Sequence, residues 1–192
     1  MGPTSRYNTE KKIEKAMKQT KLEYRMYGLV PYNISPIQQG IQFGHAVVEY
    51  GLNHYSYTEQ KGSNPYSQWA HYDKTFIILN GGTTSTNPKS PGTLNYAESE
   101  LYSMGVELST FHEPDLGDQL TAVVFLVDER VWDKEKYPDY INRLDGKDPI
   151  PGTDWHPDIM DMSPSVYYDY LFDKDATWIL EMREFLSKYK LA

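Results

Sequence analysis

Three polar side chains on one face of a predicted helix have the right chemistry to bind a ligand. Gln38, Gln42 and His45 are spaced i, i+4 and i+7, which places them along one side of a helix. Amides hold ligands by hydrogen bonds, and histidine also exchanges protons near neutral pH. The structural alternative is that Gln42 and His45 hydrogen-bond neighbouring loops, as buried polar groups must.

A second group of candidates lies on the tight connection "HEPDLGD". His112, Glu113 and Asp115 stand there, and connections of this kind often carry sites. The two acids can accept hydrogen bonds from ribose hydroxyls, act as a general base or hold a cation. Ordinary turn chemistry with solvated acids is the alternative. With His71 added, the group follows no known metal-ligand spacing, so we expect neither a metal nor a cofactor.

The other motifs in the sequence give weaker indications of function. The stretch "LNGGTTSTNPKS" has neither P-loop nor dinucleotide-binding spacing, and no serine nucleophile elbow is present. The 17 tyrosines include two dense stretches, "NHYSYTE" and "YYDYLF", that could stack a nucleobase. Packing of large, half-exposed side chains is the simpler interpretation.

The elements that position these residues follow from periodicity and caps. Ser35 and Pro36 form a helix start, and the helix is expected to run to about His54. Its expected core-facing side consists of Ile37, Ile41, Gly44, Val48 and Gly51, with Val47 beside them. The short connection after Phe111 requires an antiparallel strand pair, whereas the first strand–helix–strand unit requires a parallel one. The predicted strands are Leu22–Val30, Lys74–Gly82, Val106–Phe111 and Gln119–Val127, and the other helices are Asn8–Lys21, Asn95–Met104 and Asp175–Lys190.

The fold class is therefore α/β, with a mixed four-stranded sheet and flanking helices. We expect three parts that pack as one domain: an N-terminal helical extension (1–21), the α/β core (22–127) and an Asp-, Tyr- and Pro-rich extension that ends in a helix (128–192). The segment "TEQKGSNPYSQ" is expected to be a loop because of its composition.

Composition limits the function. The 192 residues carry a formal charge of −8, which disfavours tRNA and other nucleic acids as partners. The chain has no cysteine, no apolar run long enough for a membrane span and no apolar signal core near its start. We therefore expect a cytoplasmic protein without a membrane partner, and a homo-oligomer is compatible with the sequence.

The helix and the turn together resemble the type-two peptidyl-tRNA hydrolase family over about residues 22–127. That family carries Gly-Lys-x-Ala-Ala-Gln-x-x-His-Ala on its first helix, and Gln42, His45 and Ala46 fall on its glutamine, histidine and alanine. The segment "STFHEPDLGDQLTAVVF" takes the place of the family's second motif. The resemblance implies the fold of that family and a site that includes the helix and the turn.

The departures from the family concern catalysis. Gln38 stands where the family has a lysine implicated in catalysis, and Gln has no charge with which to hold a phosphate or polarise an ester. Glu113 and Asp115 add negative charge to the turn. The pattern resembles divergent relatives associated with phage genomes, which would place the protein in the host cytoplasm.

Three functions follow as hypotheses. The first is a degenerate hydrolase fold that binds a small nucleotide-type ligand without turnover, for example to sequester a host signalling nucleotide. Its candidate ligand-binding residues are Gln38, Gln42, His45, His112, Glu113 and Asp115. The second is an active peptidyl-tRNA hydrolase, with Gln38, His45 and Glu113 as the catalytic candidates. The third is a protein-interaction module that uses the acidic, Tyr-rich extension.

Overall fold

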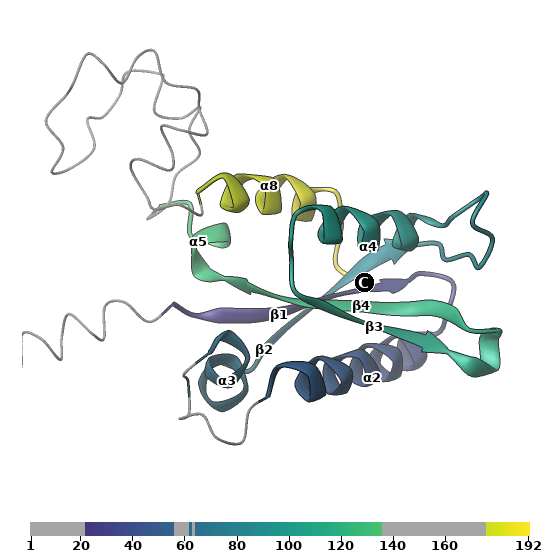
Figure 1. The fold of residues 1–192 in the computed structure, drawn as a ribbon, viewed down its shortest axis with the longest axis horizontal. Helices are drawn as coiled ribbons and strands as arrows, with labels where there is room; N and C mark the ends of the chain where they lie inside the picture. The colour runs from purple at the N-terminus through teal and green to yellow at the C-terminus, as the bar shows by residue number, and fades with distance from the viewer. Residues whose placement is uncertain (1–21, 56–61, 63, 136–175) are drawn as a thin grey trace, which may run out of the picture.

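A computed structural model describes residues 22–55, 62, 64–135 and 176–192, and it shows a four-stranded sheet with helices on both faces (Figure 1). The strand order is β2-β1-β4-β3. β1 pairs with β2 in parallel, and β4 pairs antiparallel with both β1 and β3. The predicted α/β class, the mixed sheet and both strand orientations are confirmed. The strands are β1 (Tyr24–Pro31), β2 (Thr75–Gly82), β3 (Leu108–Glu113) and β4 (Gln119–Asp128).

The helices divide between the two faces of the sheet (Figure 1). α4 (Thr93–Ser103) and α8 (Ala176–Ser187) cover one face, and α2 (Pro36–His54) covers the other together with α3 (Pro65–Gln68). Every residue of β4 after Gln119 is buried, because this strand is central and has helices on both sides. The remaining short elements are a π-helical turn η1 (Trp69–Asp73), a 3₁₀ turn η2 (Pro114–Leu116) and α5 (Glu129–Trp132).

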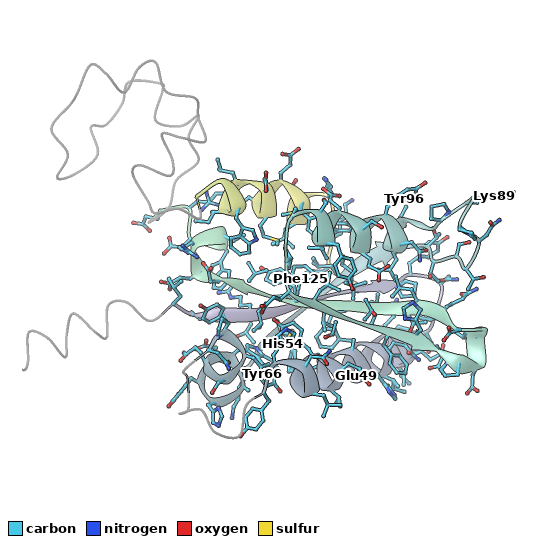
Figure 2. The ribbon with its side chains drawn as sticks, viewed as in Figure 1. Glu49, His54, Tyr66, Lys89, Tyr96 and Phe125 are labelled. Atoms are coloured by element: carbon cyan, nitrogen blue, oxygen red, sulfur yellow. The ribbon has the colours of Figure 1, made fainter. Side chains whose placement is uncertain are left out.

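Two separate cores result. The larger lies under α4 and α8, where Leu94, Leu101, Met182 and Phe185 are fully buried against the sheet and Phe125 lies at its centre (Figure 2). The smaller lies under α2, and its buried residues are Met26, Val30, Phe43, Ala46, Tyr50, Trp69, Ala122, Val124 and Leu126. The sheet therefore separates the molecule into two halves with independent packing.

The expected core-facing side of α2 is wrong. Ile37, Ile41 and Val48 are 77%, 49% and 62% exposed. Aromatic packing sets the rotation of this helix: Gly28 on β1 leaves room for the ring of Phe43, and a Cβ on that glycine would lie 2.2 Å from the ring. The residues of α2 that are buried are Gln42, Phe43, Ala46, Tyr50 and Gly51, of which only Gly51 was expected on the core-facing side.

Two loop assignments also need correction. Pro65–Gln68, expected within a loop, forms α3, because Asn64 caps the helix by accepting from Ser67 N–H at 2.7 Å and Pro65 takes its first turn. The region expected to be irregular after Val127 begins with α5, whose start is capped by Asp128. The predicted helix Asn8–Lys21 and most of the 128–175 extension lie outside the described residues.

A β-bulge in β4 determines which side chains reach which face. Phe111 pairs with Ala122 and His112 pairs with Leu120, so that Thr121 is an extra residue in the strand. Thr121 and Ala122 both lie on the α2 side, whereas Leu120 joins the core on the α4 side. The bulge thus supplies a polar group to one face and an apolar floor to the other.

Candidate functional site

Gln42 is buried and joins α2 to the β3–β4 hairpin. Its Nε2 donates to Glu113 Oε2 at 2.6 Å, and its Oε1 accepts from the Thr121 hydroxyl at 2.9 Å. The same hydroxyl lies 3.2 Å from the carbonyl oxygen of Phe111, so it can donate its single proton to either acceptor. Because its amide is used at both ends, Gln42 holds the hairpin to the helix.

The other candidates on α2 face solvent. Gln38 completes the helix cap: its Oε1 accepts from Ser35 N–H at 3.1 Å, while Ser35 Oγ accepts from Gln38 N–H at 3.3 Å. His45 is exposed and its ring lies 4.4 Å from the ring of Phe111, centroid to centroid. The side chains of Gln38 and Gln42 are thus engaged in hydrogen bonds within the protein, whereas His45 lies at the surface beside Phe111.

Glu113 has a second structural contact. Its Oε1 accepts from Asp115 N–H at 3.4 Å, which caps the η2 turn, while Oε2 is held by Gln42. One carboxylate oxygen therefore accepts from α2 and the other from the η2 turn. Asp115 is exposed at the start of that turn.

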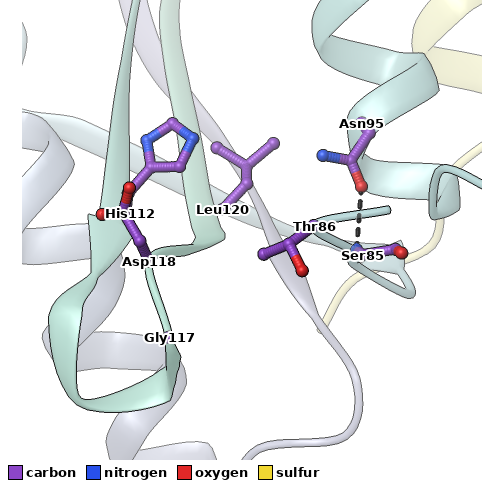
Figure 3. A pocket seen from close by; sticks show the side chains of 7 residues that line it. All are labelled: Ser85, Thr86, Asn95, His112, Gly117, Asp118 and Leu120. Carbon is purple, nitrogen blue, oxygen red and sulfur yellow. Dashed lines mark hydrogen bonds between the residues drawn. The ribbon is translucent and has the colours of Figure 1, made fainter. Parts of the chain in front are cut away.

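A cavity of about 360 Å³ lies on the opposite side of the sheet (Figure 3). Three segments form it: the loop after β2, the first turn of α4 and the β3–β4 connection. We call it the α4-side cavity, and its lining residues are Ser85, Thr86, Asn95, His112, Gly117, Asp118 and Leu120.

Local structure fixes the polar groups of this cavity. Asn95 Oδ1 accepts from Ser85 N–H and Gly92 N–H, each at 3.0 Å, which ties the loop to the start of α4. That arrangement turns the Asn95 amide nitrogen toward the cavity (Figure 3). Across from it, Asp118 adopts a left-handed backbone with φ 63° directly after Gly117, which has φ 71°. This turn brings the Asp118 carboxylate to the rim of the cavity.

His112 lies on the cavity wall, not with the other candidates. Neighbouring residues of a strand point to opposite faces, so Phe111 and Glu113 face α2 while His112 faces α4. Burial raises the pKa of Glu98 on α4, and the charge of His112 acts in the opposite direction. The histidine is thus electrostatically coupled to α4.

The structure brings only some of the predicted site residues together. Gln42 and Glu113 form a direct hydrogen bond, and His45 lies exposed on the same helix. The cavity residues Ser85, Thr86 and Asn95 were missed, because the hydroxyl-rich loop "TTSTNPKS" matches no phosphate-binding motif. The many Ser and Thr hydroxyls in this loop were the feature of the sequence that could have indicated a binding site.

Among the residues that the structure describes, no group of three His, Asp or Glu side chains is placed to hold a metal ion. Within the same residues, no helix has the length and apolarity needed to cross a membrane.

The arrangement defines a four-stranded α/β protein with a small polar cavity at one end of its α4 side. No family model matches the chain, and no curated protein matches it either.

Proposed function

We propose that the protein binds a nucleoside- or nucleotide-type small ligand in the α4-side cavity and releases it unchanged. One observation carries this proposal: hydroxyl, amide, imidazole and carboxylate groups converge over an apolar floor at Leu120. Ligand sites typically combine a few placed polar groups with apolar surface in about 300–1,000 Å³. At about 360 Å³ the cavity lies near the lower limit, which favours a single nucleotide over a dinucleotide.

The chemistry of the lining suits a sugar and a base edge. Ser85, Thr86 and the Asn95 amide offer donors and acceptors for ribose hydroxyls, and Asp118 accepts from them as well. The ring of His112 provides a flat surface of the kind on which bases stack. A ligand with several phosphates fits less well, because Asp118 adds a negative charge to the rim.

Peptidyl-tRNA hydrolysis is the weaker alternative. The side chain of Gln38 completes a helix cap, and both oxygens of Glu113 accept hydrogen bonds within the protein. A general base must come within hydrogen-bond reach of the proton that it removes, and the Glu113 carboxylate is directed at Gln42 and at its own turn. For this reason we also expect that restoring the lysine with Gln38→Lys will not produce turnover.

The test pairs two histidines, one on each side of the sheet. Protein purified from its native setting is denatured, and the released small molecules are identified by mass spectrometry; adenosine and AMP serve as probes in calorimetric titration. We expect an intact nucleotide-type compound and weaker probe binding by His112→Ala, by about 1–3 kcal/mol for the loss of base stacking on its ring. His45→Ala is the matched control and should bind like the unmodified protein.

Two results would oppose the proposal. If His45→Ala weakened binding and His112→Ala did not, the ligand would occupy the α2 side. Release of amino acids from N-acylated aminoacyl-tRNA at rates unaffected by His112→Ala would favour the hydrolase. If sequestration of a signalling nucleotide is the biological role, the captured compound should be recovered without chemical change.

A further inference from the structure

Helix α2 carries an apolar stripe on its solvent side. Ile37, Ile41, Val48 and Leu52 are between 49% and 77% exposed, although they recur at helical spacing like core residues. In the part of the chain that the structure describes, no element covers this side of the helix. Monomeric proteins rarely expose contiguous apolar patches above a few hundred Å², and larger patches mark interaction sites.

The middle of the stripe is open. Gly40 and Gly44 face solvent with no atom within 4 Å of where a Cβ would lie. Each interior glycine weakens a helix by about 1 kcal/mol relative to alanine, so Gly40 and Gly44 make α2 less stable than alanines would. Glycines on an exposed face allow another backbone to approach closely.

The stripe is symmetric along the helix axis. Ile41 and Val48 are equally distant from the midpoint between Gly44 and His45, and so are Ile37 and Leu52. When two such helices pack antiparallel around a two-fold axis at that midpoint, Ile37 meets Leu52 of the other copy. Ile41 then meets the other copy's Val48, and Gly44 lies at the crossing point, where the lack of a side chain lets the two helices approach closely. A two-fold interface requires this self-complementarity, because the same patch is used twice.

We propose that α2 is the homodimer interface of this protein, with two copies of the helix packed antiparallel across Gly44. The helix is 19 residues long and spans about 28 Å. If each of the four large side chains of the stripe loses about 100 Å² on association, each copy contributes about 400 Å² of apolar surface, half of the roughly 800 Å² per partner of a standard interface, and the polar residues that flank the stripe must supply the rest.

The charge pattern favours a second copy over other partners. α2 contains no Lys or Arg, and Glu49 is its one carboxylate. A helix that lies on a membrane surface typically carries basic residues along its polar face, and α2 has none. The stripe itself is uncharged, so two copies can meet without burying like charges despite the formal charge of −8 on each chain.

The first test measures mass in solution. Sedimentation equilibrium of the full chain at micromolar concentration should give twice the monomer mass of 22.3 kDa. Ile41→Glu places a charge at the centre of the interface and should give the monomer mass. Tyr102→Glu is the matched control: Tyr102 is 60% exposed on α4, and this variant should stay dimeric. Both sites are exposed, and circular dichroism verifies that each variant is folded.

The second test determines the orientation of the two helices. The chain has no cysteine, so single introduced cysteines report without interference. With a short bis-maleimide, Gly44→Cys should cross-link to its own copy. Ile37→Cys should not, because the two sites lie about 22 Å apart along the antiparallel pair. A mixture of Ile37→Cys and Leu52→Cys should give the mixed dimer.

A monomer mass for the unmodified chain overturns the proposal, whatever else covers the stripe. So does a dimer that Ile41→Glu leaves intact, since the interface then lies elsewhere. Efficient cross-linking of Ile37→Cys to itself would show parallel packing and overturn the antiparallel arrangement. The outcome is independent of ligand binding, because the stripe and the α4-side cavity lie on opposite sides of the sheet.

Discussion

The two sides of the sheet distribute polar and apolar groups in opposite ways. Beneath α4 and α8 the interior is apolar, and the polar groups gather in an open cavity at one end. Beneath α2 the interior includes the hydrogen-bonded group of Gln42, Thr121 and Glu113, while the apolar residues Ile37 and Leu52 face solvent. A buried amide specifies one docking position for the helix. Under the two proposals, the α4 side contributes most of the stability and binds the ligand, and the α2 side forms the dimer.

The largest expected effect is on the free energy of unfolding, because the α4 side contains the larger of the two cores. Phe185 is fully buried, with its ring 6.1 Å from that of Phe125 and 5.1 Å from that of Tyr189. Phe185→Ala should lower the free energy of unfolding by about 3–5 kcal/mol, because it removes apolar burial and leaves a cavity. Urea denaturation measures this change. A loss below about 1 kcal/mol would mean that α8 is peripheral to the fold.

A smaller effect is expected on the α2 side. Gln42→Leu should cost about 1–3 kcal/mol, chiefly because the Glu113 carboxylate loses its amide donor, while the Thr121 hydroxyl keeps the Phe111 carbonyl as an acceptor. The double variant Gln42→Leu with Thr121→Val should cost less than the sum of the two single variants, since both members of one hydrogen bond are then removed. Additive costs in a double-mutant cycle would contradict the direct contact.

The smallest effect concerns pH. Burial raises the pKa of Glu98 above its ordinary value of 4.5, and His112 opposes that shift. The folded state therefore favours the protonated acid: its contribution to stability is complete below pH 4.5 and is lost as pH rises through the folded-state pKa. Glu98→Gln keeps the side chain neutral, so its melting temperature should gain on that of the unmodified protein as pH rises from 4 toward 7. A difference that does not change with pH would contradict this.

Much of the fold follows from local patterns. The apolar run ending in Gly81 and Gly82, the Ser35–Pro36 helix start and the short connection after Phe111 each predict an element or a strand pairing. They give the parallel β1–β2 pair and the antiparallel β3–β4 pair, whereas the pairing of β1 with β4 joins distant parts of the chain. The first two pairs are why the mixed sheet could be predicted.

The site could not be predicted in the same way, for two physical reasons. The bulge at Thr121 changes which face Leu120 occupies, and an extra residue in a strand has no periodic signature in an apolar run such as "LTAVVFLV". The rotation of α2 depends on Phe43 fitting over Gly28, a contact between distant parts of the chain. Periodicity finds an apolar face but does not tell whether it meets the sheet or a partner.

The central claim is that the ligand binds on the α4 side of the sheet. It is tested most directly by ¹H–¹⁵N NMR of the full chain during titration with AMP. We predict that the largest shifts fall on the amides of Ser85, Asn95, His112 and Asp118, with little change at Gln42 and His45. Shifts concentrated at Gln42, His45 and Glu113, with the amides of the α4-side cavity unchanged, would contradict the account.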